Sequence, residues 1–392
     1  MASSQKVYRL KGVVQHYAWG GYDFLPALLN LPAGERKPWA EYWLGAHPNC
    51  PADAEGQKLD ELLRKQSASL PFLLKVLDVR QMLSIQVHPD KASAKKGFNA
   101  ENEAGVPLKA PHRNYKDDNH KPELMVALSE FYLLHGFKPA VELRKMLDEV
   151  PELNYLLPLF DAGGYRAVYE EVMCCGQEKV DSVLTPLMER IVPLYERGDL
   201  PKDSEHFWAA RAASLFCPDC IYDRGIFSIY LFNLLRLSAG EGVYQPAGMP
   251  HAYLEGQNIE IMANSDNVLR AGLTDKHIDI EELMKHIRFE PTVPQVLKGE
   301  AGSDHRRFAP PVAEFELVQY EWKEGDRAEI STRSREIWLL AQGGIGLEAE
   351  GERREIQKGG AIYVQDGTEI KINAGSPSVL FRALVPEGEK IR

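Results

Sequence analysis

The alternation of apolar and polar residues divides the chain into β-rich and helical regions. Up to about residue 135, short apolar runs such as residues 72–77 and 82–87 are separated by Pro, Gly and Asn, which predicts an antiparallel sandwich or barrel. From about residue 139 the period changes, because apolar residues between 180 and 194 recur at helical i, i+3 and i+4 spacing. Pro186 and Pro193 fall inside this pattern and are expected to kink or break the helix.

A second helix is predicted at residues 204–216, which are rich in Ala and aromatic residues. Strand character then returns in the apolar run 226–231. A short helix is predicted at residues 280–287, with Asp279 as its N-cap and Glu282 at the third position of its first turn.

The C-terminal part of the chain is β-rich again. A polar linker is predicted at about residues 300–307. Beyond it, strand-like runs are separated by glycine turn signals at residues 343–344, 358–360 and 366–367.

Candidate chemistry lies in the stretch LSIQVHPD at residues 83–90. Gln86 and His88 are two residues apart, and a β-strand sends alternate side chains to opposite faces, so both should point into the same space. Imidazole is a good ligand for a borderline metal, and an amide oxygen can complete a nitrogen and oxygen set. Glu123, in HKPE, and His251, in a corner shaped by Gly and Pro, supply matching parts. Each residue alone would more often be a core or solvated side chain.

In this order, the segments resemble the type I phosphomannose isomerases, zinc enzymes that interconvert mannose 6-phosphate and fructose 6-phosphate. The resemblance covers about residues 7–290. It extends to QHYAWG at residues 15–20, AEYWLGAHP at residues 40–48 and NSDNVLRAGLT at residues 264–274.

The resemblance implies a fold, a cofactor and a reaction. The fold is mainly β with a helical insertion, built from cupin-like double-stranded β-helix (jelly-roll) domains. One Zn²⁺ per chain would be bound by Gln86, His88, Glu123 and His251. The reaction is an aldose–ketose isomerisation through an enediol or enediolate, which feeds mannose activation for glycan synthesis or mannose catabolism.

A single metal site requires a discontinuous sandwich, because His88 and His251 lie on either side of the helical region. The predicted division is a catalytic sandwich at residues 1–138 and 223–300, a helical insertion at 139–222 and a C-terminal sandwich at 301–392. The last histidine is His305. The C-terminal sandwich should therefore hold no metal and play a structural or capping role.

Isomerisation also needs cations near the developing negative charge and a group that moves a proton. The resemblance places Arg270 in the active site, although Asp266 on the same strand face could simply pair with it. Lys121 would supplement the metal. Glu260 interrupts an apolar run and is the first candidate for the acid/base, with His120 as the alternative.

The substrate's phosphate needs fixed cations, for which Lys276 and Arg270 are suited. Further pocket candidates have packing as the competing explanation. They are Trp19, Glu41, Lys75, Ser84 and Asp266.

The net charge of −11 argues against nucleic acid or an anionic membrane surface as partner. An anionic sugar phosphate must then be drawn in by a local basic pocket. The first residues lack the apolar core of a signal peptide, and no apolar run approaches the ~20 residues of a membrane span. The five cysteines are best interpreted as reduced thiols. We therefore expect a cytoplasmic protein that works as a monomer.

Two other classes of function remain open. The first is a non-catalytic, metal-containing sugar-binding protein of the cupin type. The second is a metal-dependent oxygenase, but such sites favour two histidines and one carboxylate with open positions. Gln86 as a fourth ligand disfavours the oxygenase.

Overall fold

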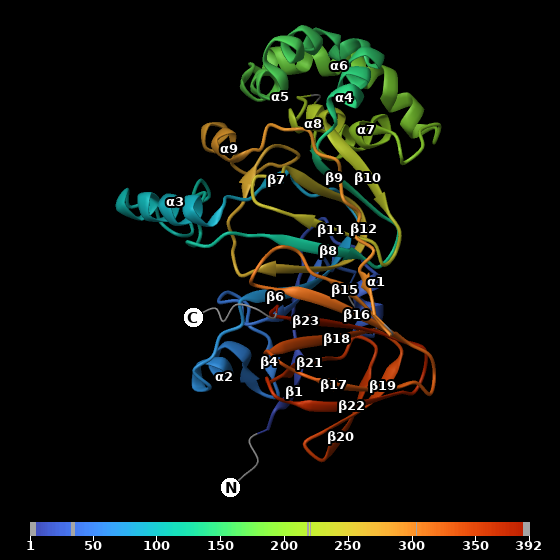
Figure 1. The fold of residues 1–392 in the computed structure, drawn as a ribbon. Helices are drawn as coiled ribbons and strands as arrows, with labels where there is room; N and C mark the ends of the chain where they lie inside the picture. Colours follow the sequence, from blue (N-terminus) through green and yellow to red (C-terminus); the bar gives the residue numbers. More distant parts are fainter. Residues whose placement is uncertain (1–4, 33–35, 218, 220, 303, 387–392) are drawn as a thin grey trace.

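The computed structural model describes residues 5–32, 36–217, 219, 221–302 and 304–386. A helical cap, a middle β-sandwich and a C-terminal β-sandwich follow one another along the long axis of the molecule (Figure 1). This arrangement confirms the prediction of a mainly β protein with a helical insertion.

The middle sandwich is a 10-stranded sheet that folds over on itself. Its strands are β2 (Val13–Gln15), β3 (Glu41–Gly45), β6 (Phe72–Val79), β7 (Gln86–Val87), β8 (Glu123–Ala127), β9 (Phe131–Phe137), β10 (Phe232–Leu237), β11 (Gly242–Gln245), β12 (His251–Ala263) and β13 (Leu269–Arg270). Of the predicted strand at residues 82–87, only β7 forms.

Strand β12 belongs to both halves of this sandwich. Its first residues pair with β7 and β9, and its later residues pair with β6 and β8. The change occurs at Gly256, whose φ is 129° and where a Cβ would lie 2.6 Å from the carbonyl oxygen of Glu130. Only glycine fits this bend, which brings the two sheets face to face.

The cap contains α4 (Ala140–Glu149), the 3₁₀ helix η1 (Pro151–Leu156), α5 (Leu157–Cys174), α6 (Gln177–Glu196), α7 (Glu205–Phe216) and α8 (Gly225–Leu231). The strand expected at residues 226–231 is wrong, and so is the expectation that Pro186 or Pro193 breaks its helix. The run 226–231 is helix α8 rather than a strand, because every residue of this helix is buried and an apolar run without polar alternation fits either structure. Pro186 and Pro193 lie inside α6 without ending it, because its apolar face is anchored by burial in the cap.

The C-terminal sandwich joins a 9-stranded sheet to a 4-stranded sheet around an apolar core. The larger sheet contains β14 (Glu300–Ala301), β15 (His305–Phe308), β16 (Glu316–Trp322), β23 (Ser378–Leu384), β18 (Glu336–Gln342), β21 (Ala361–Val364), β1 (Val7–Lys11), β4 (Asp53–Ala54) and β5 (Gln57–Lys58). The smaller contains β17 (Arg327–Ser331), β22 (Glu369–Ala374), β19 (Gly344–Ala349) and β20 (Glu352–Gln357).

The glycine turns of this sandwich were predicted correctly: Gly343, Gly359 and Gly367 have positive φ. The linker expected at residues 300–307 instead contains β14 and β15, which pair along the sheet edge. Strands β1, β4 and β5 come from the N-terminal part of the chain. We therefore propose to keep the predicted division with these three strands moved to the C-terminal sandwich.

The two sandwiches pack through the outer face of the middle sheet. Leu74, Val76, Ile259 and Ile261 enter an apolar cluster shared with residues of β16, β18 and β23. The residues between them on β6 and β12 must point the other way, into the middle sandwich. This alternation turns a row of polar side chains inward.

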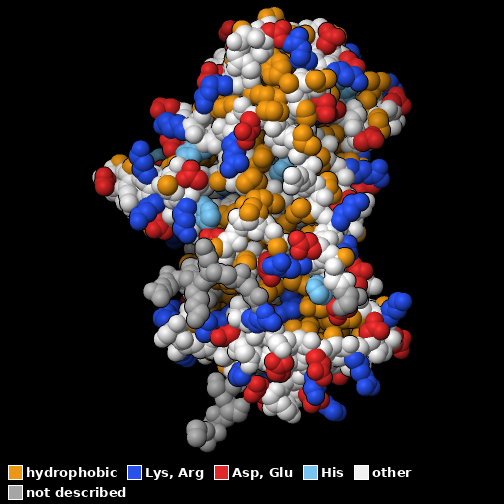
Figure 2. Space-filling view, in the orientation of Figure 1, with side chains coloured by type: hydrophobic (Ala, Val, Ile, Leu, Met, Phe, Trp, Pro, Cys, Tyr) orange, Lys and Arg blue, Asp and Glu red, His pale blue; other side chains and the backbone are white. Residues whose placement is uncertain are grey.

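The remaining helices are α1 (Phe24–Leu28), α2 (Leu59–Lys65), α3 (Lys91–Glu103) and α9 (Ile280–His286). Helix α9 confirms its predicted start, because the Asp279 side chain accepts a hydrogen bond of 3.0 Å from the Glu282 N–H. None of the helices in the described residues could cross a membrane. Acidic and basic side chains are interspersed over the face drawn in Figure 2.

Candidate active site

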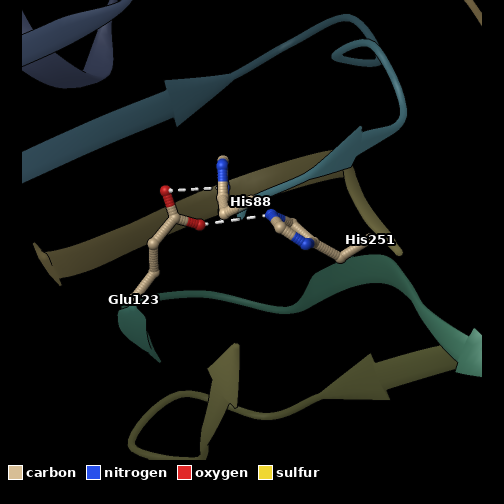
Figure 3. Close-up of side chains that lie close together, drawn as sticks. All are labelled: His88, Glu123 and His251. Atoms are coloured by element: carbon tan, nitrogen blue, oxygen red, sulfur yellow. Dashed lines mark ion pairs between the residues drawn. The ribbon is translucent and has the colours of Figure 1, made fainter. Parts of the chain in front are cut away.

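Three buried side chains converge inside the middle sandwich (Figure 3). His88 follows β7, Glu123 begins β8 and His251 begins β12. Glu123 Oε1 lies 3.4 Å from His88 Nε2, and Glu123 Oε2 lies 3.2 Å from His251 Nε2. One carboxylate thus faces both imidazoles.

The hydrogen bonds of the two Nδ1 atoms show which ring nitrogen of each histidine carries a hydrogen. His88 Nδ1 donates to the carbonyl of Asn267 at 2.8 Å, and His251 Nδ1 donates to the carbonyl of Met249 at 2.9 Å. A carbonyl oxygen only accepts, so each Nδ1 carries the hydrogen. Burial lowers the pKa of His88 to about 4, so this ring is neutral at pH 7 and its Nε2 is a bare lone pair.

Bare imidazole nitrogens that face carboxylate oxygens need a cation between them. His88 is fully buried and its Nε2 has no hydrogen-bond partner within the described part of the chain. A zinc ion with tetrahedral nitrogen and oxygen ligands holds those atoms about 3.3 Å apart, close to the distances here. Gln86 lies directly opposite His251 between β7 and β12. The donor set and its spacing therefore fit zinc.

Lys121 keeps the carboxylate of Glu123 ionised. Its Nζ lies 3.0 Å from Glu123 Oε1. Burial alone would raise the pKa of Glu123, but the ammonium of Lys121 holds it well below its usual range.

A cavity of about 560 Å³ opens above this cluster. Its walls include nine of the residues singled out from the sequence: Trp19, Glu41, Lys75, Ser84, Gln86, Lys121, Asp266, Arg270 and Lys276. A smaller cavity beneath it shares Glu41, Lys75, Gln86 and Lys121 and reaches Glu123, His251 and Glu260. Glu123 and His251 of the buried cluster thus line the smaller cavity, which shares four residues with a pocket large enough for a small polar molecule.

Known proteins resemble the whole chain. Residues 7–140 match the phosphomannose isomerase type I catalytic domain. The mannose-6-phosphate isomerase of Salmonella typhimurium is 33% identical over 405 residues, which covers 95% of this chain and 98% of that protein. Mannose-6-phosphate isomerase 1 of Arabidopsis thaliana is also 33% identical, with 97% and 94% covered.

The chain belongs to the type I phosphomannose isomerases.

Solved structures of this family agree with the fold. The metal-free Salmonella typhimurium mannose 6-phosphate isomerase matches with a TM-score of 0.87 and 30% identity, covering 97% of this chain and 100% of that one. A structure of that enzyme bound to fructose 6-phosphate and zinc matches with a TM-score of 0.86 and 29% identity over the same shares.

Glu260 is a buried carboxyl group whose surroundings suit the role of acid/base. Lys75 Nζ lies 3.1 Å from its Oε1, and the hydroxyl of Tyr253 donates to its Oε2 at 2.9 Å. Burial raises the pKa of Glu260, although Lys75 opposes the shift. A carboxylate with a raised pKa is suited to accept a proton near neutral pH.

The alternative acid/base, His120, lies elsewhere. Its Nε2 is 2.7 Å from Glu314 Oε1, in the loop between β15 and β16 of the C-terminal sandwich. His120 is not among the residues that line either cavity. This geometry favours Glu260.

Arg270 does not form the structural pair with Asp266 that the sequence left open. Asp266 instead lies 3.4 Å from His47 Nε2 and accepts a hydrogen bond of 2.9 Å from Asn49. Arg270 lies opposite Gln86 between β13 and β7, and no ion pair to it occurs among the described residues. Arg270 lines the cavity, and Lys276 is exposed at the same cavity.

Sequence reasoning missed two supporting residues. Tyr253 donates to Glu260, and the Asn267 carbonyl orients His88. Tyr253 lies two residues after His251, so strand parity could have indicated that it faces the site. The Asn267 contact uses a backbone atom, for which no side-chain pattern exists.

Proposed function

We propose that this chain is a zinc-dependent mannose-6-phosphate isomerase, which interconverts mannose 6-phosphate and fructose 6-phosphate through an enediol or enediolate. The observation that carries the proposal is the cluster of His88, Glu123 and His251, of which Glu123 and His251 line a cavity with basic side chains. Membership of the family and its zinc- and fructose 6-phosphate-bound structure support it.

One zinc ion per chain would be held by His88 Nε2, His251 Nε2, the carboxylate of Glu123 and the amide oxygen of Gln86. When bound, zinc acts as a Lewis acid that stabilises negative charge on a substrate oxygen. The backbone carbonyls that orient both imidazoles keep their lone pairs aimed at this point.

The reaction moves a proton between carbons 1 and 2 of the open-chain sugar. We propose that Glu260 removes the C2 proton of the aldose and returns it to C1, while the hydroxyl proton on O2 passes to O1. Lys75 and Tyr253 hold the Glu260 carboxylate in place. Burial keeps bulk water from exchanging with the transferred proton.

Residues that line the cavity have the remaining roles in the proposed reaction. Arg270 and Lys121 stabilise the negative charge of the enediolate. Lys276, with Arg270, holds the phosphate at the open end of the cavity. Trp19, Glu41, Ser84 and Asp266 shape the substrate site.

The alternative to an enzyme was a non-catalytic, metal-containing sugar-binding protein of the cupin type, and membership of an isomerase family disfavours it. It has no need for a buried carboxyl group of raised pKa beside the metal ligands, which is the observation that favours an enzyme. We further propose a cytoplasmic monomer that feeds mannose activation for glycan synthesis or mannose catabolism.

A coupled assay for fructose 6-phosphate formed from mannose 6-phosphate tests the proposed reaction. Turnover should disappear when a chelator removes the metal and return when Zn²⁺ is added in excess. Full turnover in metal-free protein would contradict a zinc-dependent isomerase.

A further inference from the structure

Two more polar side chains are buried beside the metal ligands, each on a neighbouring strand. His135 on β9 lies directly opposite His251 on β12. Gln245 on β11 lies directly opposite Glu123 on β8. Side chains of directly opposed residues share one face of a sheet. His135 and Gln245 therefore point into the same interior as the ligands.

A hydrogen bond of 2.8 Å joins His135 Nδ1 to Gln245 Oε1. The amide oxygen only accepts, so the imidazole donates. The bond links β9 to β11, which belong to the two facing halves of the sandwich. It runs beside the contact of 3.2 Å between His251 and Glu123, which links the neighbouring strands β12 and β8.

The buried pair of His135 and Gln245 costs stability, and this cost needs an explanation. His135 is 4% exposed and Gln245 is 0% exposed. Gln245 Nε2 has no hydrogen-bond partner in the part of the chain that the structure describes. Burying an unpaired amide donor lowers stability, a cost that an apolar pair of similar volume would avoid. A directional bond, however, fixes the separation of two sheets more closely than an apolar contact does.

We propose that His135 and Gln245 are a positioning pair that holds the two halves of the sandwich at the spacing required for zinc. The inference rests on the ligand roles proposed for His251 and Glu123. His135 itself is not part of the group whose ligand atoms lie within 4.8 Å of one another. The pair acts through the strands of the ligands and sets how well the metal-free site is preorganised.

The pair predicts a loss of zinc affinity without a matching loss of chemistry. Outer residues that support metal ligands typically change metal affinity ~10–100-fold. His135→Phe, Gln245→Leu and the double variant should each weaken zinc binding by about this factor. The double variant should be no weaker than either single variant, since one bond is lost in all three. Turnover at saturating zinc should change less than about 3-fold.

Zinc affinity should be measured by competition with a chromogenic chelator, beside the unfolding free energy of each metal-free variant. Tyr169→Phe is the matched control, because it removes a buried side-chain hydrogen bond of 3.3 Å to Ser228 in the helical cap. It should leave zinc affinity unchanged. If His135→Phe does not fold, Gln245→Leu alone gives the same test.

Unchanged zinc affinity in the folded variants, or an equal loss in Tyr169→Phe, would overturn the positioning role. Additive losses in the double variant would also overturn it, because the two residues would then act separately. The chelator competition measures zinc affinity and does not depend on turnover. The result therefore stands apart from the proposed reaction, whose failure would appear only in the coupled assay.

Discussion

Each of the two sandwiches contains a glutamate, a tryptophan and a cationic side chain in contact with one another. The two clusters differ in how the cation is paired. In the C-terminal sandwich, the guanidinium of Arg382 forks onto both oxygens of Glu336 at 2.8 and 2.9 Å. Trp338 donates to the same carboxylate at 2.6 Å, and Arg382 lies 5.0 Å from its ring centre. Tyr320 accepts a further bond from Arg382.

In the middle sandwich, Trp43 donates to Glu41, and Lys75 lies 5.1 Å from the Trp43 ring centre. Lys75 Nζ is 3.6 Å from Glu41 and only 3.1 Å from Glu260. The cation is therefore shared between two carboxylates rather than enclosed by one.

The difference separates a structural charge cluster from a functional one. Glu336 and Arg382 satisfy each other through two hydrogen bonds, although both also line a cavity of about 300 Å³ in the C-terminal sandwich. Around Lys75 the charges stay open to a cavity, and His88 Nε2 in the same interior has no partner among the described residues. The lone pair of His88 Nε2 faces a carboxylate oxygen of Glu123 at 3.4 Å, and a cation bound between them would satisfy both atoms. The following variants test this distinction, from the largest expected effect on turnover to the smallest.

Glu260→Gln should have the largest effect. It removes the proposed base but keeps the shape of the side chain, so turnover should fall about 10²–10⁴-fold while zinc content stays the same. Steady-state kinetics and elemental analysis measure both quantities. His120→Asn is the control. A larger loss of turnover in His120→Asn than in Glu260→Gln would transfer the base role to His120.

Arg270→Lys should follow. A compact ammonium cannot reproduce the planar fork of a guanidinium, and loss of one preorganised charge contact costs about 10²–10³ in turnover. KM should change much less if the contact forms mainly in the transition state. A thermal melt shows whether the fold is kept. A strongly lowered Tm with near-normal turnover would make Arg270 a structural residue like Arg382.

The pH dependence of turnover should report the raised pKa of Glu260. A base must be ionised, so turnover of zinc-saturated enzyme should fall about tenfold per unit of pH below that pKa. The midpoint should lie above about 4.3, the value of an unperturbed glutamate. Turnover in Glu260→Gln should lack this acid limb. An acid limb of the same midpoint in that variant would assign it to another group.

Glu336→Gln should have the smallest effect on turnover and a large effect on stability. It leaves the buried Arg382 without its counter-charge, and breaking one side of a buried pair costs about 3–5 kcal/mol. Urea unfolding should detect this loss, while kcat of the folded protein stays unchanged. A fall in kcat comparable to that of Glu260→Gln would show that the C-terminal cluster takes part in the reaction.

Part of the fold and of the candidate site could be predicted from the sequence. The features that could not be predicted were missed for physical reasons. Strand parity predicts that Gln86 and His88 point into the same space, and Gln86 does lie directly opposite the second histidine, His251. The glycine turns mark the C-terminal strands. Helix α8 was mistaken for a strand because burial on all sides erases its periodicity. The bond between His135 and Gln245 depends on the bend of β12, which no local pattern reports.

A zinc titration of metal-free protein, with fructose 6-phosphate formation followed at each point, is the most direct test. It separates the catalytic role of the middle sandwich from the structural role of the C-terminal charge cluster. Turnover should rise linearly and saturate at one zinc per chain, both in the wild type and in Glu336→Gln. His88→Ala should show neither tight zinc binding nor activation. Activity in metal-free protein, or full activation of His88→Ala by one zinc per chain, would contradict the assignment of the middle sandwich as the catalytic centre.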